Sequence, residues 1–195
     1  MKTHISLILA LSALSASALD LHPHYIDADA DGVSIRRPYF SDGSKKYSLR
    51  LNNETELQPY EDGAIFRFIK LKDAAMRLRP SPFSVDTKFD PENLTRYLET
   101  ARQLLPQLAE GVALYQETPN PMPINAWTSH RFVFKYKTQV GEVRESITFL
   151  NITPTAQVIV QVYAMDKEFA DADSRAWDII RRWYELDSST ASRGN

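Results

Sequence analysis

The stretch from residue 127 to residue 186 limits the possible folds more than any other part of this chain. It contains three strand-like runs and then a tryptophan-rich segment with helical spacing. In the first run apolar side chains recur at every second residue, which places them on one face of a strand. These residues are Phe132, Phe134, Tyr136 and Val140. The pattern predicts an antiparallel meander closed by an amphipathic C-terminal helix.

The expected pairing within this meander follows from its two turns. Gly141-Glu142 fits a two-residue turn with glycine first, and a second turn forms around Pro154. Both turns then bring apolar residues opposite one another, as cross-strand packing requires. The predicted pairs are Val140–Val143, Tyr136–Ile147, Phe134–Phe149, Phe149–Val158 and Ile147–Val160.

The closing helix should begin near Asp171 or Asp173, since either aspartate can cap a helix. Its apolar side chains recur at helical spacing and predict one buried stripe. The stripe consists of Ala172, Ala176, Ile179 or Ile180, Trp183 and Leu186. The polar tail 187–195 is expected to be disordered.

Upstream of residue 127 the pattern alternates between short strands and one helix. Extended runs are expected near residues 33–36, 47–51, 64–71, 76–79 and 112–116. Asp90 followed by Pro91 marks the start of a helix that reaches about Leu105. The fold class predicted is α+β, with an antiparallel sheet of about six strands, helices packed on its faces and a closing C-terminal helix.

The N-terminus is typical of a secretory signal. Lys2 precedes a short apolar run from Ile5 to Leu14, and Ala16-Ser17-Ala18 matches a cleavage site. The run is too short to span a membrane, so no transmembrane segment is expected after cleavage. The alternative is an uncleaved amphipathic anchor. The predicted organisation is a signal peptide 1–18, an irregular leader 19–32, a single α+β domain 33–186 and the tail.

Composition narrows the setting. The chain has no cysteine, which excludes disulfides. For a secreted protein this favours a bacterial envelope, periplasmic or secreted, over a eukaryotic extracellular space. Loss of Lys2 with the signal leaves 22 basic residues (23 − 1) against 25 acidic ones, a net charge of −3. Nothing in this balance indicates a nucleic-acid partner.

The order of elements resembles a known superfamily. The residues that carry the resemblance are the hairpin 132–150, the run 158–163 and the helix 176–183. They are similar to the PsbP-like superfamily, which includes photosystem extrinsic proteins, a Ran-binding nuclear protein and uncharacterised bacterial secreted proteins. The resemblance implies an antiparallel sheet between helices and an envelope setting. It carries over no metal-binding or partner-binding residue.

Two N-terminal patterns suggest metals. Asp27, Asp29 and Asp31 followed by Gly32 open a calcium loop of the EF-hand kind, but the twelfth position is Pro38, which has no side-chain oxygen. His22 and His24 make at most a weak transition-metal site. We therefore expect no metal and no cofactor.

Catalytic patterns are sparse. Cysteine chemistry is excluded, and no glycine-flanked nucleophilic serine is present. His130 is the one histidine within the predicted domain, so a hydrolase assembled from scattered residues would have to include it. Glu142 and Glu145 lie close to the predicted hairpin tip and are interpreted as surface residues.

The remaining candidate is a binding surface formed by Trp127, His130 and Arg131 beside the proline-rich connector, although a loop packed over a sheet edge would look the same. The sequence thus favours a non-catalytic secreted domain that binds or scaffolds an unknown envelope protein or small ligand. A hydrolase that uses His130 is the first alternative. A purely structural envelope component is the second.

Overall fold

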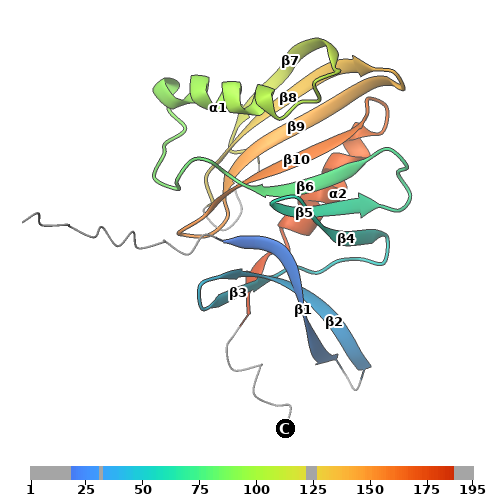
Figure 1. The fold of residues 1–195 in the computed structure, drawn as a ribbon, viewed down its shortest axis with the longest axis vertical. Coiled ribbons are helices and arrows are strands. Elements are labelled where there is room, and N and C mark those ends of the chain that lie inside the picture. The colour runs from blue at the N-terminus through green and yellow to red at the C-terminus, as the bar shows by residue number, and fades with distance from the viewer. Residues whose placement is uncertain (1–18, 31–32, 122–126, 187–195) are drawn as a thin grey trace, which may run out of the picture.

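The computed structural model describes residues 19–30, 33–121 and 127–186, with backbone alone at residues 28–30, 33 and 34. The predicted signal 1–18 and the tail 187–195 lie outside these residues, as does part of the proline-rich connector. The described chain forms two antiparallel sheets and two helices (Figure 1). The elements are β1 (Asp20–Ala30), β2 (Val33–Asp42), β3 (Lys45–Ser48), β4 (Thr55–Tyr60), β5 (Gly63–Phe68), β6 (Ala75–Pro80), α1 (Pro91–Gln103), β7 (Glu110–Pro119), β8 (Ser129–Thr138), β9 (Gly141–Asn151), β10 (Gln157–Met165), α2 (Phe169–Ile180) and β11 (Tyr184–Glu185).

The strands divide into a large and a small sheet. The large sheet has seven strands in the order β4-β5-β6-β10-β9-β8-β7, and the small one has four in the order β1-β2-β3-β11. The α+β class and the closing helix are confirmed, but the prediction of about six strands was too low. The sequence pattern did not reveal β4, whose Pro59 is tolerated because this strand lies at a sheet edge.

The N-terminal segment is part of the fold. Residues 20–30 form β1 and pair with β2, for example Asp27 with Arg36, so the prediction of an irregular leader was wrong. Leu19 and Leu21 are buried in the core. The formation of β1 depends on that burial and on pairing with β2 more than on the intrinsic β propensity of its residues. For this reason the local sequence pattern did not reveal the strand.

The helices lie on opposite faces of the large sheet. In Figure 1, α1 crosses the face formed by β7, β8 and β9, and α2 lies behind β10 and β6. The predicted cap of α1 is confirmed, since Asp90 Oδ1 accepts a 3.0 Å hydrogen bond from the Asn93 amide. Helix α2 starts at Phe169, earlier than predicted, and Asp173 lies within it instead of capping it.

Both predicted registers of the meander were wrong. The β8–β9 turn lies at Gln139-Val140, two residues before the predicted turn. Gly141 instead begins β9 with φ +135°, and an added Cβ would lie 2.7 Å from the Met165 side chain. The observed pairs are Tyr136–Val143, Phe134–Glu145, Phe132–Ile147, Phe149–Ile159 and Leu150–Val158.

The one-residue slip between β9 and β10 decides which helix each residue meets. Phe149 packs in a cluster with Tyr97 of α1, whereas Val158 packs in a separate cluster with α2. A strand reverses its faces when its register shifts by one residue, so the predicted shared face of these two side chains does not exist. The α2 cluster also includes Phe40 and Trp183, and it therefore joins the two sheets.

Candidate binding site at the end of the seven-stranded sheet

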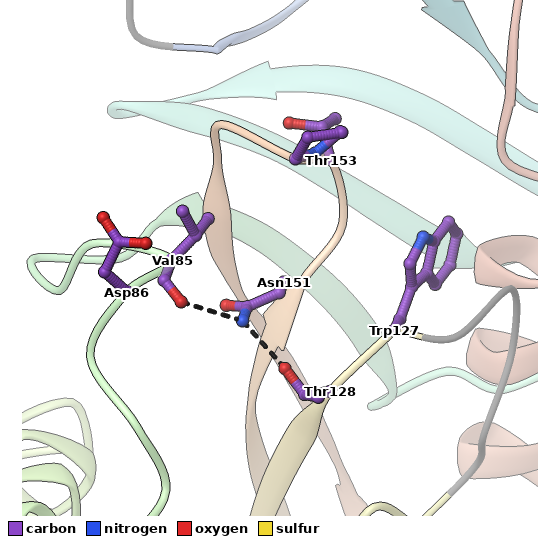
Figure 2. A pocket seen from close by; sticks show the side chains of 7 residues that line it. Val85, Asp86, Trp127, Thr128, Asn151 and Thr153 are labelled. Atoms are coloured by element: carbon purple, nitrogen blue, oxygen red, sulfur yellow. Dashed lines mark hydrogen bonds between the residues drawn. The ribbon is translucent and has the colours of Figure 1, made fainter.

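An open depression of about 410 Å³ lies at the end of the large sheet where β8 begins and β9 ends (Figure 2). It is shared by the loop before α1, the start of β8 and the β9–β10 turn, three segments that are far apart in the sequence. Its volume is within the range of small-ligand sites. The lining residues are Val85, Asp86, Trp127, Thr128, Asn151, Thr153 and Pro154.

Asn151 holds these segments together from the end of β9. Its Nδ2 donates to the Val85 carbonyl at 3.2 Å and to Thr128 Oγ1 at 2.8 Å, as the dashed lines in Figure 2 show. Its Oδ1 accepts from Gln157 Nε2 at 2.9 Å. Both the nitrogen and the oxygen of the Asn151 amide are therefore engaged within the protein. These bonds fix the loop before α1 and the start of β8 relative to the end of β9.

Thr153 ties the same region to the small sheet. This side chain is buried, and its Oγ1 accepts a 2.9 Å hydrogen bond from the Ala156 amide. The hydroxyl donates to Asp42 Oδ2 at 3.4 Å, and Thr155 donates to the same oxygen at 2.5 Å. Thr153 thus serves the framework of the depression.

Asp86 and Trp127 are the side chains of the lining that remain available. Asp86 is exposed and makes no hydrogen bond or ion pair with any residue that the structure describes. Trp127 is half-buried and packs against the α2 cluster. Figure 2 shows the two side chains on opposite sides of Asn151. A carboxylate and an indole ring therefore face a depression whose framework is already satisfied.

His130 lies elsewhere. Its side chain is buried on the α1 face, where the ring packs against Phe89 and Phe132. Its Nε2 donates to Glu117 Oε1 at 2.8 Å. His130 does not line the depression. The depression therefore does not bring a hydroxyl and a carboxylate around this histidine, as a hydrolase site would require.

Arg131 projects to the α2 face. Its Nη2 donates to Asp173 Oδ1 at 2.9 Å, with both side chains mostly buried. Burial raises the pKa of Asp173, although the Arg131 guanidinium and hydrogen bonds from neighbouring donors act to lower it. The structure therefore does not bring Trp127, His130 and Arg131 into one surface, and a binding role for these residues stays a prediction.

The sequence reasoning missed a buried polar cluster on the α1 face. Glu145 is 2% exposed, which contradicts its interpretation as a surface residue. It accepts hydrogen bonds from the Tyr136 hydroxyl and from Gln161 Nε2. Burial raises the pKa of Glu145 against the lowering effects of these donors and of nearby Arg77, and it also raises the pKa of Tyr136. Glu145 lies between Val143 and Ile147 on the same apolar face of β9, and the true hairpin register places it beside Phe134.

The two N-terminal histidines converge on one carboxylate. Asp20 lies 3.0 Å from His22 Nδ1 and 2.8 Å from His24 Nε2, and His22 Nε2 lies 2.9 Å from the Glu61 carbonyl. Burial alone would raise the pKa of Asp20, but the histidine hydrogen bonds hold it at about 2. The Glu61 carbonyl and Asp20 raise the pKa of His22.

The described residues contain no group of three or more histidine, cysteine, aspartate or glutamate side chains placed to hold a metal ion. The start of the calcium-like pattern, Asp27, lies in β1 opposite Arg36 of β2, so residues 27–30 are an extended strand and not a loop. Within the part of the chain that the structure describes, neither helix has the length and apolar character needed to cross a bilayer.

Comparison with known proteins finds similar solved structures but no similar sequence. No protein-family model and no curated protein sequence matches the chain. The structure is similar to that of LpqN of Mycobacterium tuberculosis, involved in cell envelope biogenesis, with TM-score 0.48, 12% identity and coverage of 85% of this chain and 92% of LpqN. A mutant of the protein Mog1 gives TM-score 0.46 at 10% identity, with 86% of this chain and 98% of that one covered.

PsbP of the cyanobacterium Synechocystis gives TM-score 0.43 at 8% identity, with 89% of this chain and 96% of PsbP covered. The chain is thus structurally similar to Mog1 and PsbP proteins at low sequence identity. Membership of the PsbP-like superfamily stays a prediction, and no site residue is transferred from these structures.

Proposed function

We propose that this protein is an exported, non-catalytic binding domain of the bacterial cell envelope and that its ligand occupies the depression between Asp86 and Trp127. The observation that carries the proposal is that some lining side chains are hydrogen-bonded within the protein and others are not. Asn151 and Thr153 are engaged in hydrogen bonds of the framework, whereas Asp86 and the Trp127 indole make no hydrogen bond or ion pair with a described residue. A preorganised concavity with a few unengaged polar and aromatic groups is typical of small-ligand sites.

Export is supported by the signal pattern at the N-terminus. The test is expression of the full-length chain in a Gram-negative bacterium, followed by fractionation and mass measurement. The expected product is a periplasmic chain that begins at Leu19. A cytoplasmic chain that retains residues 1–18 would contradict export.

The hydrolase alternative has less support, because the ring of His130 is buried and its Nε2 is committed to Glu117. A general base must reach the proton that it removes, and the depression offers no histidine among its lining residues. The binding proposal needs no such group.

Ligand binding is tested by NMR with isotope-labelled protein and a soluble extract of the bacterial envelope. Shift changes are expected for the amides of Thr128 and Asn151, which line the depression. In the Asp86→Asn variant these shift changes should be smaller at the same extract concentration. Asp73→Asn is the matched control, since Asp73 is an exposed carboxylate just before β6, at the opposite end of β10 from Asn151. Shifts confined to other surfaces would place the ligand elsewhere and refute this site.

A further inference from the structure

A histidine joins the first strand of the fold to the large sheet. His22 lies on β1, the edge strand of the small sheet, and its Nε2 lies 2.9 Å from the carbonyl oxygen of Glu61. Glu61 is in the turn between β4 and β5, where it has a left-handed backbone conformation with φ 44°. The Tyr25 hydroxyl makes a further bond from β1 to this hairpin, donating to the Leu57 carbonyl at 3.3 Å. His22 thus connects the two sheets at a place outside the depression.

Both ring nitrogens of His22 face hydrogen-bond acceptors. Nδ1 lies 3.0 Å from Asp20 Oδ1, and Nε2 faces the Glu61 carbonyl. A neutral imidazole carries one N–H and can donate one of these bonds, whereas the imidazolium donates both. With the ring neutral, one nitrogen lone pair points at an oxygen that has no proton to donate. The arrangement therefore favours the imidazolium.

His24 lies beside the same carboxylate but differs in this respect. Its Nε2 lies 2.8 Å from Asp20 Oδ2, and its ring stacks on Tyr39 with 5.3 Å between the ring centroids. Its Nδ1 makes no hydrogen bond with a residue that the structure describes. A neutral His24 can therefore satisfy its contact with Asp20, so the need for a second ring proton belongs to His22.

The charged groups on the large-sheet side also favour a protonated His22. The Glu61 carbonyl, the Asp20 carboxylate and the charge of Asp62 raise the pKa of His22, against the opposing effect of burial. Arg79 of β6 contributes positive charge, but it pairs with the carboxylates of both Glu61 and Asp62, at 3.1 and 3.3 Å. One cation therefore faces two carboxylates there, and the balance is negative.

Positive charge on the small-sheet side acts in the opposite sense. Lys46 of β3 lies over a tyrosine ring of β2, and a chain that begins at Leu19 carries an ammonium group next to Asp20. A protonated His24 would share the Asp20 carboxylate with His22. The variants compared below leave the lysine, the ammonium group and His24 unchanged, so none of these groups can account for a difference between the variants.

We propose that His22 is a pH-responsive tie between the two sheets, with its imidazolium bridging the Asp20 carboxylate and the Glu61 carbonyl. Loss of the second ring proton breaks one of the two bonds and loosens β1 from the β4–β5 turn. The edge strand then opens more often, which exposes the otherwise buried side chains of Leu19 and Leu21. The tie does not involve the depression, so this proposal is independent of the proposed ligand site.

The pH range of the tie follows from its two titrating groups. Because the pKa of His22 is raised in the fold, its contribution is fully present below the pKa of an unfolded histidine, about 6.5. That contribution is lost as the pH rises through the folded pKa. Asp20, with its pKa lowered to about 2, contributes fully above about pH 4 and loses its contribution as the pH falls through about 2. The tie is therefore complete in mild acid.

The titration of His22 is measured by NMR of its ring C–H and nitrogen signals, identified by their loss in His22→Gln. The midpoint should lie above about 6.5, and both ring nitrogens should carry a proton below it. Asp20→Asn should lower the midpoint, because the amide has no negative charge and is a weaker acceptor. A midpoint at or below about 6.5 in the unaltered chain would overturn the proposal.

Amide hydrogen exchange measures the opening of β1. After correction for the intrinsic exchange rate at each pH, protection of the β1 amides should fall about 2- to 5-fold as the pH rises through the His22 midpoint. Amides of β10, the middle strand of the large sheet, are the reference for changes in the whole fold. By linkage, the fall in protection must equal the ratio of the proton affinities of His22 in the closed and open strand. The two measurements therefore check each other.

Two variants separate the tie from simple packing. His22→Gln keeps a neutral donor, so protection of β1 should no longer depend on pH in this range. Tyr25→Phe removes the bond to the Leu57 carbonyl and should lower protection of β1 equally at every pH. A pH response of β1 that persists in His22→Gln, or that is absent from the unaltered chain, would show that His22 is not such a tie.

Discussion

The two faces of the seven-stranded sheet differ in where they place their polar groups. The α2 face is apolar along β10, with Val158, Val160 and Val162 buried in one cluster. Its buried charges, Arg131 and Asp173, pair directly with each other. The α1 face instead buries a carboxylate within the sheet.

That carboxylate, Glu145, has neutral donors in Tyr136 and Gln161 and no ion pair with a described residue. The guanidinium of nearby Arg77 lies over the rings of Tyr60 and Tyr163, at 4.8 and 5.0 Å. The comparison teaches that similar burial has different consequences. A counter-ion offsets part of the desolvation penalty of a buried charge, whereas a buried charge without one bears that penalty in full.

The largest effect is expected on the α2 side, at Trp183. Its ring stacks on Phe40 and Tyr47 at 5.2 and 5.7 Å and so connects the C-terminal segment to the small sheet. Trp183→Ala should lower the free energy of unfolding by about 3–5 kcal/mol, because it removes a fully packed aromatic side chain. Urea denaturation measures the change. A loss below about 1 kcal/mol would mean that the α2 cluster does not depend on this connection.

An intermediate effect is expected at the paired charges. Arg131→Ala leaves the Asp173 carboxylate buried without its cation and should cost up to about 3 kcal/mol at neutral pH. Removal of the guanidinium raises the pKa of Asp173 further, so the loss should shrink as the pH falls and the carboxylate is protonated.

The double variant with Asp173→Asn is the control for this pair, since an amide needs no counter-ion. It should recover part of the loss at neutral pH. Denaturation of the double variant and of the single variants Arg131→Ala and Asp173→Asn completes a double-mutant cycle. If Arg131→Ala were equally destabilising at all pH values, lost packing would be the cause and not the unpaired charge.

The smallest effect has the opposite sign. Because burial raises the folded-state pKa of Glu145, this group's contribution to stability is most favourable below the unfolded pKa. It declines as pH rises through the folded pKa. Glu145→Gln keeps the size and can still accept from Tyr136, so it should raise stability at pH 7 by about 1 kcal/mol and remove that decline.

Denaturation between pH 4 and pH 7 checks this expectation. Glu142→Gln is the matched control, since Glu142 is an exposed carboxylate on the same strand and should show neither effect. A destabilising Glu145→Gln would indicate that the charged form is favoured at this position, and the contrast between the two faces would then fail.

Local signals predicted part of the fold. Asp90 and Pro91 located the start of α1, and apolar alternation located the strands of the meander. The β8–β9 register failed because Gly141 was interpreted as a turn residue. Its lack of a side chain instead makes room for Met165, which is distant in sequence. Such a close approach leaves no local trace in the pattern.

Of the residues that line the depression, the sequence pattern singled out Trp127 alone as a candidate binding residue. Trp127 was identified as part of a mixed aromatic and polar segment, and it lines the depression. Asp86 and Asn151 could not be identified, because one lies in the loop before α1 and the other at the end of β9. Sequence spacing does not show that the Asn151 amide joins these segments.

The sequence by itself determined the α+β class, the first helix with its cap and the presence of a closing amphipathic helix, because each depends on neighbours within a few residues. The tertiary structure alone decided the strand registers and the small sheet. It also decided that Asp86 and Trp127 border one depression. These features depend on contacts between residues that are distant in the chain, and such contacts are settled when the whole core packs at once.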